Sequence, residues 1–440
     1  MEKVLKTTLE ETRILSAEVT FSERTLVKPL LLSTGPISVI TEATAHVRVR
    51  CGAVEASGAG SICLSDLWAW PEPELDHGRR DAAMRRIADW IAGNLKELCG
   101  GPAHPLELGL RLHEAVLHSH PEPLPGHPMP ALALANALSP FDAALHDAAG
   151  RALDCSAFSF YAEDAAIPSA ARLFPKSNAT RAVRALLRPE PARELPAWLI
   201  VGKQDDLERD VRPWVRDRGY GCFKLKIMGK GAAEDAARTA EVYRAVRAFG
   251  AARPRLSVDS NEGNPDAASV LEYLERLAAL DREAFDALGY LEQPTSRDIV
   301  RRPEDWRRVA AVKPVLLDEG LTSFERLAEA EEQGWSGLAL KTCKGHSFAL
   351  AAAAWAHQRG LPVALQDLTN PGLSAIHAAW FAAFVPTLNG VELNSPQFMP
   401  SANAAWMPRL AGLFEPRDGA HRLPGKVPAG LGSVWDGLPA

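Results

Sequence analysis

Three lysines and a series of acidic residues end apolar segments in the second half of the chain. Lys224 and Lys226 stand two positions apart in GCFKLKIMG, residues 221–229. Residues at this spacing on a β-strand point to the same side, so the two ammonium groups should lie side by side. Charged lysines are almost never fully buried unless they are paired. The motif therefore raises the question of which groups neutralise this pair.

Polar residues also end the apolar runs that follow. They are Asp259 with Asn261, Glu292 with Gln293, Asp318 with Glu319, Lys341, Gln366 with Asp367, and Glu392 with Asn394. Each residue alone is compatible with a turn, a helix cap or a solvated surface position. Their repeated occurrence at the carboxyl ends of strand-like runs favours one shared site, since barrels of alternating strands and helices form their active sites at that face.

Three of these carboxylates predict a metal site. Asp259, Glu292 and Asp318 on consecutive strands would repel one another unless positive charge lies among them. Hard oxygen ligands with open positions suit Mg²⁺, with Mn²⁺ as the second choice, and the absence of His and Cys from the set argues against zinc. Glu319 is the alternative to Asp318, because adjacent strand residues face opposite ways.

The lysines would flank such a metal. Lys224 and Lys226 precede the first carboxylate, and Lys341 follows the last. A nearby cation lowers the pKa of a lysine toward a value useful for a base. We expect Lys226 to be the base and Lys224 to lower its pKa and hold a substrate oxygen. This arrangement suits removal of a proton α to a carboxylate, with the enediolate stabilised by the metal.

The elements that position these residues begin near residue 195. Eight apolar strand-like runs occupy residues 195–202, 222–228, 255–260, 287–294, 314–320, 337–343, 361–368 and 390–395. Helical stretches such as 232–250 and 347–360 separate most of them, which favours βαβ units in a parallel sheet. Their nearly continuous apolar character fits burial on both faces. Eight strands indicate a closed (β/α)₈-type barrel.

The earlier part of the chain has a mixed pattern. It contains a strand at 43–52, a helix at 79–98, a proline-rich loop at 118–130 and one or two buried helices at 131–153. We therefore predict four parts, which are an N-terminal α+β domain (1–155), a connecting segment (156–194), the barrel (195–400) and a C-terminal segment (401–440) that returns to the first domain.

Composition narrows the function classes. The 440 residues are 47% hydrophobic and 24% charged, which is an ordinary globular mixture able to bury a large core. A net charge of −6 gives no reason to expect nucleic acid or an anionic membrane as partner. The N-terminus lacks the apolar core of a signal peptide, and six scattered cysteines without a C-x-x-C pair favour reduced thiols in a cytoplasmic protein.

Five motifs in order carry a family resemblance. They are KLK at 224–226, DSNEG from Asp259, LEQP around Glu292, LLDEG around Asp318 and LKTCKG from Lys341. Over about residues 20–400 the chain resembles the enolase superfamily, and within it the muconate lactonizing enzyme-like subgroup. The resemblance implies a capping domain on a TIM-like, modified (β/α)₇β barrel, the metal ligands and catalytic lysines named above, a small-molecule carboxylate substrate and a homo-oligomer.

The resemblance also implies that two loops of the capping domain cover the barrel mouth, at about 22–36 and 58–72. Trp68 and Trp70 in the second loop either line the pocket or pack on the barrel. Dipeptide epimerases of this subgroup carry Asp-x-Asp on the eighth strand, where this chain has Glu392 and Asn394, so a standard dipeptide substrate is disfavoured. Residues expected to contact substrate or support the site are Asn261, Gln293, Glu319, Lys344, Asp367, Glu392, Trp68 and Trp70.

We expect a metal-dependent racemase or epimerase, because lysines on two sides can remove a proton and return it on the opposite face. The same site could instead catalyse cycloisomerisation or a β-elimination such as acid-sugar dehydration, although the seventh strand lacks the His that such dehydratases often use. A barrel without catalysis that serves as a scaffold is the alternative from another class. The five intact polar motifs argue against it, since a scaffold has no need of a costly cluster of like charges.

Overall fold

The N-terminal part of the chain is built on a meander of three antiparallel strands. The computed structural model describes residues 8–32 and 35–434. The sheet has the order β1-β2-β3, with β1 at Arg13–Leu32, β2 at Gly35–Cys51 and β3 at Val54–Leu64. Most of the first expected cap loop is therefore a long hairpin of strands, and positions 33–34 of that loop lie outside the described residues, as do 1–7 and 435–440 at the outer ends of the predicted N- and C-terminal parts.

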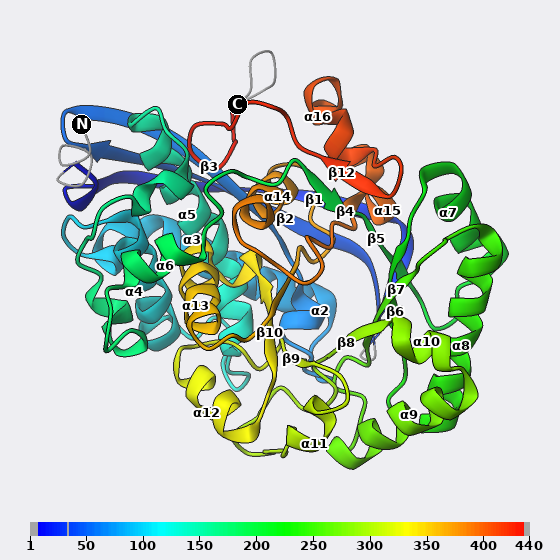
Figure 1. Cartoon of the computed structure of the whole chain (residues 1–440). Helices are drawn as coiled ribbons and strands as arrows, with labels where there is room; N and C mark the ends of the chain where they lie inside the picture. The colour runs from blue at the N-terminus through cyan, green and yellow to red at the C-terminus, as the bar shows by residue number, and fades with distance from the viewer. Residues whose placement is uncertain (1–7, 33–34, 435–440) are drawn as a thin grey trace.

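Helices cover one face of this sheet (Figure 1). They are α2 (Asp66–Ala69), α3 (His77–Cys99) and α5 (Ala131–Ala152), while α4 (Pro105–Ser119) packs on α3 and α5. The expected buried helices at 131–153 form one helix, which continues through Pro140. Helix α5 lies directly on β3, where a Cβ atom at Gly60 would collide with the backbone carbonyl of Pro140. Gly60 thus permits the close approach of helix and strand.

Seven parallel strands form the second sheet, in the order β11-β10-β9-β8-β7-β6-β5. They are β5 (Trp198–Val201), β6 (Cys222–Lys226), β7 (Arg255–Asp259), β8 (Leu288–Glu292), β9 (Val315–Leu317), β10 (Gly337–Lys341) and β11 (Val363–Gln366). The helices between and after them are η3 (Leu207–Val211), α7 (Arg212–Arg218), α8 (Ala232–Phe249), α9 (Ala267–Leu280), α10 (Arg282–Ala287), α11 (Arg307–Ala310), α12 (Glu325–Gln333), η4 (Thr342–Lys344), α13 (His346–Gln358) and α14 (Gly372–Phe384). Figure 1 shows these helices outside the curled strands, as expected for a TIM-like barrel.

The eighth strand-like run is reduced in the structure. Residues 390–395 make one parallel bridge, between Gln366 and Glu392, and no longer ladder. The contact with β5 on the other side is made by a side chain, since the Gln397 amide accepts from Ile200 N at 3.1 Å and donates to Ile200 O at 2.8 Å. This amide supplies the backbone hydrogen bonds that a regular eighth strand would have supplied.

Alternation along the strands separates two cores. One set of side chains forms an apolar layer, made of Trp198, Cys222, Tyr290, Leu316, Ala339 and Ala364. The residues two positions after Cys222, Tyr290, Leu316, Ala339 and Ala364 are Lys224, Glu292, Asp318, Lys341 and Gln366. Side chains of the other parity, such as Phe223 and Leu225, belong to the large core shared with the helices. Burial on both faces explains the nearly continuous apolar runs.

The remaining segments connect the two parts. They are η1 (Ala157–Tyr161), η2 (Pro168–Leu173), α6 (Ala179–Leu186), β4 (Glu194–Pro196), α15 (Ser395–Phe398), η5 (Pro400–Trp406), α16 (Met407–Phe414) and β12 (Ala420–Arg422). Strand β12 pairs with β4, and further on Leu431 N donates to Asp147 of α5 at 2.8 Å. The C-terminal segment therefore contacts both the start of the barrel and the N-terminal helices.

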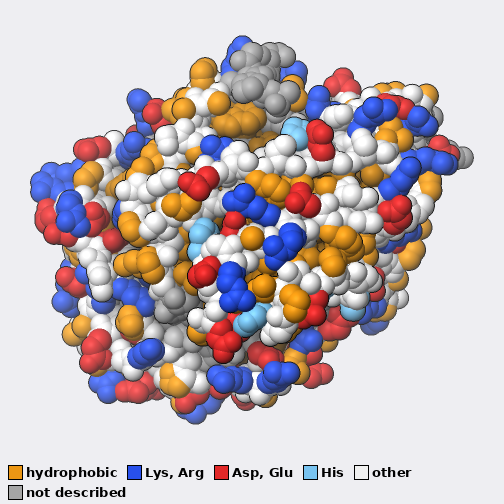
Figure 2. All heavy atoms as spheres, turned by 180° about the vertical axis from the view of Figure 1, so that it is seen from behind, with side chains coloured by type: hydrophobic (Ala, Val, Ile, Leu, Met, Phe, Trp, Pro, Cys, Tyr) orange, Lys and Arg blue, Asp and Glu red, His pale blue; other side chains and the backbone are white. Residues whose placement is uncertain are grey.

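The outer surface carries mixed charge. Figure 2 shows Lys and Arg side chains interspersed with Asp and Glu over the face opposite to that of Figure 1. Within residues 8–32 and 35–434, no helix combines the length and the apolar character needed to cross a bilayer.

Candidate active site

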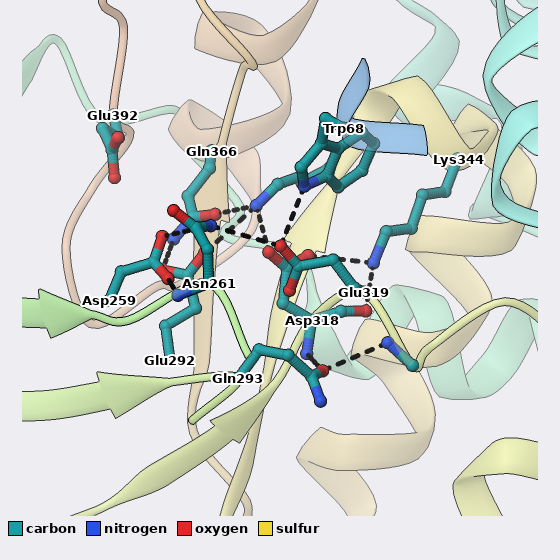
Figure 3. Close-up of polar contacts among 12 residues, drawn as sticks. Trp68, Asp259, Asn261, Glu292, Gln293, Asp318, Glu319, Lys344, Gln366 and Glu392 are labelled. Atoms are coloured by element: carbon teal, nitrogen blue, oxygen red, sulfur yellow. Dashed lines mark hydrogen bonds and ion pairs between the residues drawn. The ribbon is translucent and has the colours of Figure 1, made fainter. Parts of the chain in front are cut away.

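The carboxyl ends of the parallel strands bring the predicted acidic residues together (Figure 3). Asp259 is the last residue of β7, Glu292 the last of β8, and Asp318 directly follows β9. The ladder register aligns Lys226 with Asp259, and Asp259 with Glu292. All three carboxylates are at most 2% exposed, so each needs a partner that offsets its lost hydration.

Lys224 and Lys226 are side by side, as the strand parity predicts. Their Nζ atoms lie 3.3 and 2.5 Å from the same oxygen, Oδ2 of Asp259. Lys226 also donates to Asn261 Oδ1 at 3.0 Å, and Lys224 reaches Glu292 at 2.8 Å. The buried pair is thus neutralised by the carboxylates of the next two strands.

Lys341 approaches the same cluster from the opposite direction. Its Nζ lies 2.6 Å from Asp318 Oδ2 and 3.2 Å from Glu292 Oε1. The amide of Gln366 accepts from Lys341 and donates to Glu292 Oε2. Glu292 is therefore the central carboxylate, contacted by lysines from both sides.

These contacts determine the direction of the pKa shifts. Burial disfavours the charged lysine, yet the carboxylates of Glu292, Glu392 and Asp259 outweigh it and raise the pKa of Lys224 well above its usual value. Burial likewise opposes charge on Lys341, but Asp318 and Glu292 raise its pKa. In the protein alone both lysines are held protonated. This is opposite to the lowered lysine pKa that a neighbouring cation produces.

The carboxylates do not form a ready ligand set. Among residues 8–32 and 35–434, no group of three Asp, Glu, His or Cys side chains is arranged to hold a metal ion. The reason lies in the ion pairs, since Lys224 contacts both Asp259 and Glu292, and Lys341 contacts both Glu292 and Asp318. The ammonium groups occupy the positions between the carboxylates.

Three of the other predicted residues hold these carboxylates in place. Asn261 N donates to Asp259 Oδ1 at 2.7 Å. Gln293 Oε1 accepts from the backbone N of Asp318 at 2.9 Å. Lys344 Nζ donates to the backbone O of Asp318 at 2.6 Å and lies 3.1 Å from its Oδ1. Of these three residues, Asn261 lines the cavity, whereas Gln293 and Lys344 do not.

The two tryptophans differ in position. Trp68 lines the cavity, donates from Nε1 to Glu319 Oε1 at 2.9 Å, and lies with its ring centroid 5.5 Å from Lys341 Nζ. Trp70 is buried in the large apolar core and does not line the cavity. Burial and the nearby Asp318 and Asp259 raise the pKa of Glu319 to about 8. Glu319 thus supports the Trp68 indole, while Asp318 faces the lysines.

Glu392 and Asp367, near the reduced eighth strand, differ in whether they line the cavity. Glu392 lines the cavity, with Oε2 at 3.5 Å from Lys224 Nζ and Oε1 accepting from Asn394 Nδ2 at 2.8 Å. Asp367 does not line it, and instead accepts from Thr369 N at 2.9 Å. Burial raises the pKa of Asp367 well above its usual range, and the nearby Glu392 carboxylate adds to the rise.

Sequence reasoning missed part of the cavity lining. Gln366 was among the polar residues predicted at strand ends but was given no role, and it lines the cavity and links Lys341 to Glu292. The aliphatic lining residues carry no such signal, and they are Leu30, Leu32, Ile37, Ile40, Ile200 and Leu368. Apolar residues of this kind are common throughout any core, so their type does not mark a pocket.

The comparisons with known proteins agree with this geometry. The family model described as enolase C-terminal domain-like matches residues 206–437, more than half of the chain. The chain belongs to that family. No curated protein matches the chain at a significant level.

Solved structures of the family share the fold over nearly the whole chain. A muconate lactonizing enzyme from Pseudomonas fluorescens, complexed with muconolactone, is 20% identical, with a TM-score of 0.64 and 96% of each chain covered. A dipeptide epimerase from Enterococcus faecalis, complexed with Mg and L-Leu-L-Tyr, is 15% identical, with a TM-score of 0.65 and coverage of 96% of this chain and 99% of that one. A protein from Bradyrhizobium, described as enolase and complexed with magnesium and mandelic acid, is 19% identical, with a TM-score of 0.62 and coverage of 97% and 96%. At these identities the likeness shows the fold alone.

Proposed function

We propose that the protein is a divalent-metal-dependent enzyme that abstracts the α-proton of a carboxylate substrate, and that it acts as a racemase or epimerase. The observation that carries the proposal is the placement of Lys226 and Lys341. They come from β6 and β10, on either side of the carboxylates of β7, β8 and β9, and each contacts a different one of them, Asp259 or Asp318.

Asp259, Glu292 and Asp318 would hold the metal. They offer carboxylate oxygens at three consecutive strand ends, the donor type that Mg²⁺ and Mn²⁺ prefer. Ammonium groups now offset the negative charge of these carboxylates, and a bound cation would take over that role as the lysine contacts give way. A bound divalent cation would stabilise the negative charge that develops on the substrate carboxylate when its α-proton leaves. Relatives crystallised with Mg support this assignment.

In this scheme the lysines divide the work. Lys226 in its neutral form removes the α-proton, and the electron pair of the broken C–H bond moves into the carboxylate to give the enediolate. Lys341, protonated, delivers a proton to the opposite face of the same carbon. Lys224 stays protonated, held by Glu292, and balances charge on a substrate oxygen. In the reverse direction Lys226 and Lys341 exchange roles.

A second candidate has one specific observation in its favour. Lys341 is held by Glu292, Asp318 and the Gln366 amide, whereas Lys226 has Asp259 and Asn261. If Lys341 keeps all three partners during turnover, it acts only as a fixed positive charge. The enzyme would then be a cycloisomerase or lyase with one base, which fits the muconate lactonizing enzymes among its structural relatives.

Proton exchange tests the proposal directly. The purified protein is incubated in deuterated water with α-substituted carboxylates, with Mg²⁺, with Mn²⁺ or with a chelator, and loss of the α-proton signal is followed by NMR. We expect exchange only with the divalent cation. Exchange that the chelator leaves unchanged would contradict the metal-dependent scheme, and no exchange with any acid would contradict α-proton abstraction.

A further inference from the structure

The cavity above the strand ends has two chemically different halves. Its floor is the cluster of lysines, carboxylates and amides described above, where the substrate carboxylate must lie if the proposed function holds. Its wall is aliphatic and comes from the β1–β2 hairpin, β5 and the segment after β11, through Leu30, Leu32, Ile37, Ile40, Ile200 and Leu368. The wall therefore faces whatever group the α-carbon carries besides its carboxylate.

No cation belongs to the wall among the described residues. The three lysines that line the cavity are all on the floor, and each lies within 2.8 Å of a carboxylate oxygen. Lys28 is on the same hairpin as the wall, but it pairs with Asp205 at 3.4 Å and does not line the cavity. A second anionic group on the substrate would lose its hydration against aliphatic side chains without gaining a counter-charge.

The wall also has little capacity for hydrogen bonds. Among the described residues, the hydroxyl groups that line the cavity are those of Ser65 and Thr369, and Thr369 Oγ1 already donates to the backbone O of Leu368. The Trp68 indole N–H is engaged by Glu319. A substituent with several hydroxyl groups would leave most of them unpaired, whereas an alkyl or aryl group would bury apolar surface against the wall.

From this division we propose that the substrate is a monocarboxylate whose α-carbon carries an uncharged, mainly apolar substituent. The inference rests on the proposed function, which places the reacting carboxylate on the floor. It excludes dicarboxylates and polyhydroxylated sugar acids as preferred substrates.

Three acids of equal chain length test this inference. 2-Hydroxypentanoate, 2-hydroxyglutarate and arabinonate differ mainly in whether the far end of the chain is apolar, anionic or hydroxylated. Binding of each to the Mg²⁺-loaded protein is measured by calorimetry, and α-proton exchange by NMR in deuterated water. We expect 2-hydroxypentanoate to bind about tenfold or more tightly than the other two, the discrimination expected when a polar group is buried unpaired. Tighter binding of either polar acid would overturn the inference.

A pair of neighbouring substitutions provides the matched test. Leu30→Arg adds a cation to the cavity wall at a partly buried position, where the apolar stem of the arginine can pack against the wall. Leu31→Arg adds the same charge one residue away, at a position that is 40% exposed and does not line the cavity. We expect Leu30→Arg to shift the preference about tenfold toward 2-hydroxyglutarate and Leu31→Arg to leave it unchanged.

The outcomes distinguish a failure of the proposed function from a failure of the substrate inference alone. If all three acids fail to bind and to exchange with the native protein, the proposed function fails and this inference with it. If acids exchange but Leu30→Arg leaves their ranking unchanged, the wall does not contact the substituent and only the inference fails. Thermal unfolding of both variants checks folding, and Leu32→Arg on the same wall replaces Leu30→Arg if that variant is unfolded.

Discussion

Lys224 on β6 and Lys341 on β10 donate to the same atom, Oε1 of Glu292, at 3.0 and 3.2 Å. In the sheet order, β8 with Glu292 lies midway between those two strands. In a flat sheet β6 and β10 would lie about 19 Å apart, four strand spacings, and the side chains could not share one oxygen. Curling of the sheet therefore places amines from β6 and β10 on two sides of one carboxylate. The proposed two-sided proton transfer relies on the same curling, which brings Lys226 of β6 and Lys341 of β10 to one site.

The first prediction concerns the two outer lysines. In deuterated water, Lys341→Ala should still exchange the α-proton of one enantiomer but fail to interconvert the pair, and Lys226→Ala should show the mirror behaviour. Each loss of a general base should lower the affected rate by about 10²–10⁴-fold. Lys230→Ala, at an exposed position close by in the sequence, is the control and should behave as the native protein. Full turnover by Lys341→Ala would favour the one-base cycloisomerase or lyase instead.

The second prediction concerns the central carboxylate. Glu292→Gln removes one proposed ligand and the charge that Lys224 and Lys341 share, so divalent cation binding should be lost or greatly weakened. Calorimetric titration with Mn²⁺ measures this without any substrate. Glu272→Gln, which changes a half-exposed glutamate on α9, should bind the cation as the native protein does. Unchanged affinity in Glu292→Gln would remove Glu292 from the ligand set.

The third prediction concerns the junction between α5 and the loop after the Lys341 strand. Asp142 on α5 accepts from the backbone N and the hydroxyl of Ser347, both at 2.7 Å, at the start of α13. Asp142 therefore caps α13, a helix of the barrel. The space around it is tight, since a Cβ atom at Gly109 would collide with the Asp142 carboxylate. Asp142→Ala should lower the free energy of unfolding by about 1–3 kcal/mol.

Urea denaturation measures the stability of that variant, and Asp142→Asn serves as the milder comparison, because its amide oxygen can still accept one of the two bonds. Equal stability of the native protein and Asp142→Ala would show that the cap contributes nothing. A stable variant with reduced proton exchange would show that the cap also positions the nearby Lys344, which donates to Asp318.

The fourth prediction concerns pH. Burial lowers the pKa of His421 to about 4, although its Nδ1 is bonded to the backbone O of Leu413 at 2.7 Å. Between about pH 4 and 6.5 the unfolded chain therefore binds one more proton at this site than the folded chain. The stability that this residue contributes is present above pH 6.5 and is lost as the pH falls, by about 2 kcal/mol between pH 7 and pH 5.

His421→Asn keeps a donor for Leu413 O but cannot titrate. Between pH 7 and pH 5, the free energy of unfolding should therefore fall by about 2 kcal/mol less in this variant than in the native protein. Denaturant titrations at the two pH values measure it. Identical pH dependence in both proteins would show that His421 does not contribute.

The approximate strand ends and the order of the polar residues on them could be predicted from local sequence patterns. Alternation is a local property of a β-strand, so the parity of Lys224 and Lys226 follows from their spacing alone. The register that aligns Lys226, Asp259 and Glu292 is a property of the paired strands and is seen only in the structure. The same local rule of alternation required that only one of Asp318 and Glu319 face the lysines, and the structure shows that it is Asp318.

Which groups meet across the barrel, and which residues cover them, depends on how the whole chain folds. That Lys224 and Lys341 share one oxygen depends on how strongly the sheet curls, and no short segment of sequence encodes that curvature. Trp68 lines the cavity and Trp70 does not, although both are buried in the same apolar core and belong to one short stretch. The aliphatic wall could not be predicted either. Hydrophobic burial is non-directional, so the sequence does not distinguish a leucine in a core from a leucine that lines a substrate cavity.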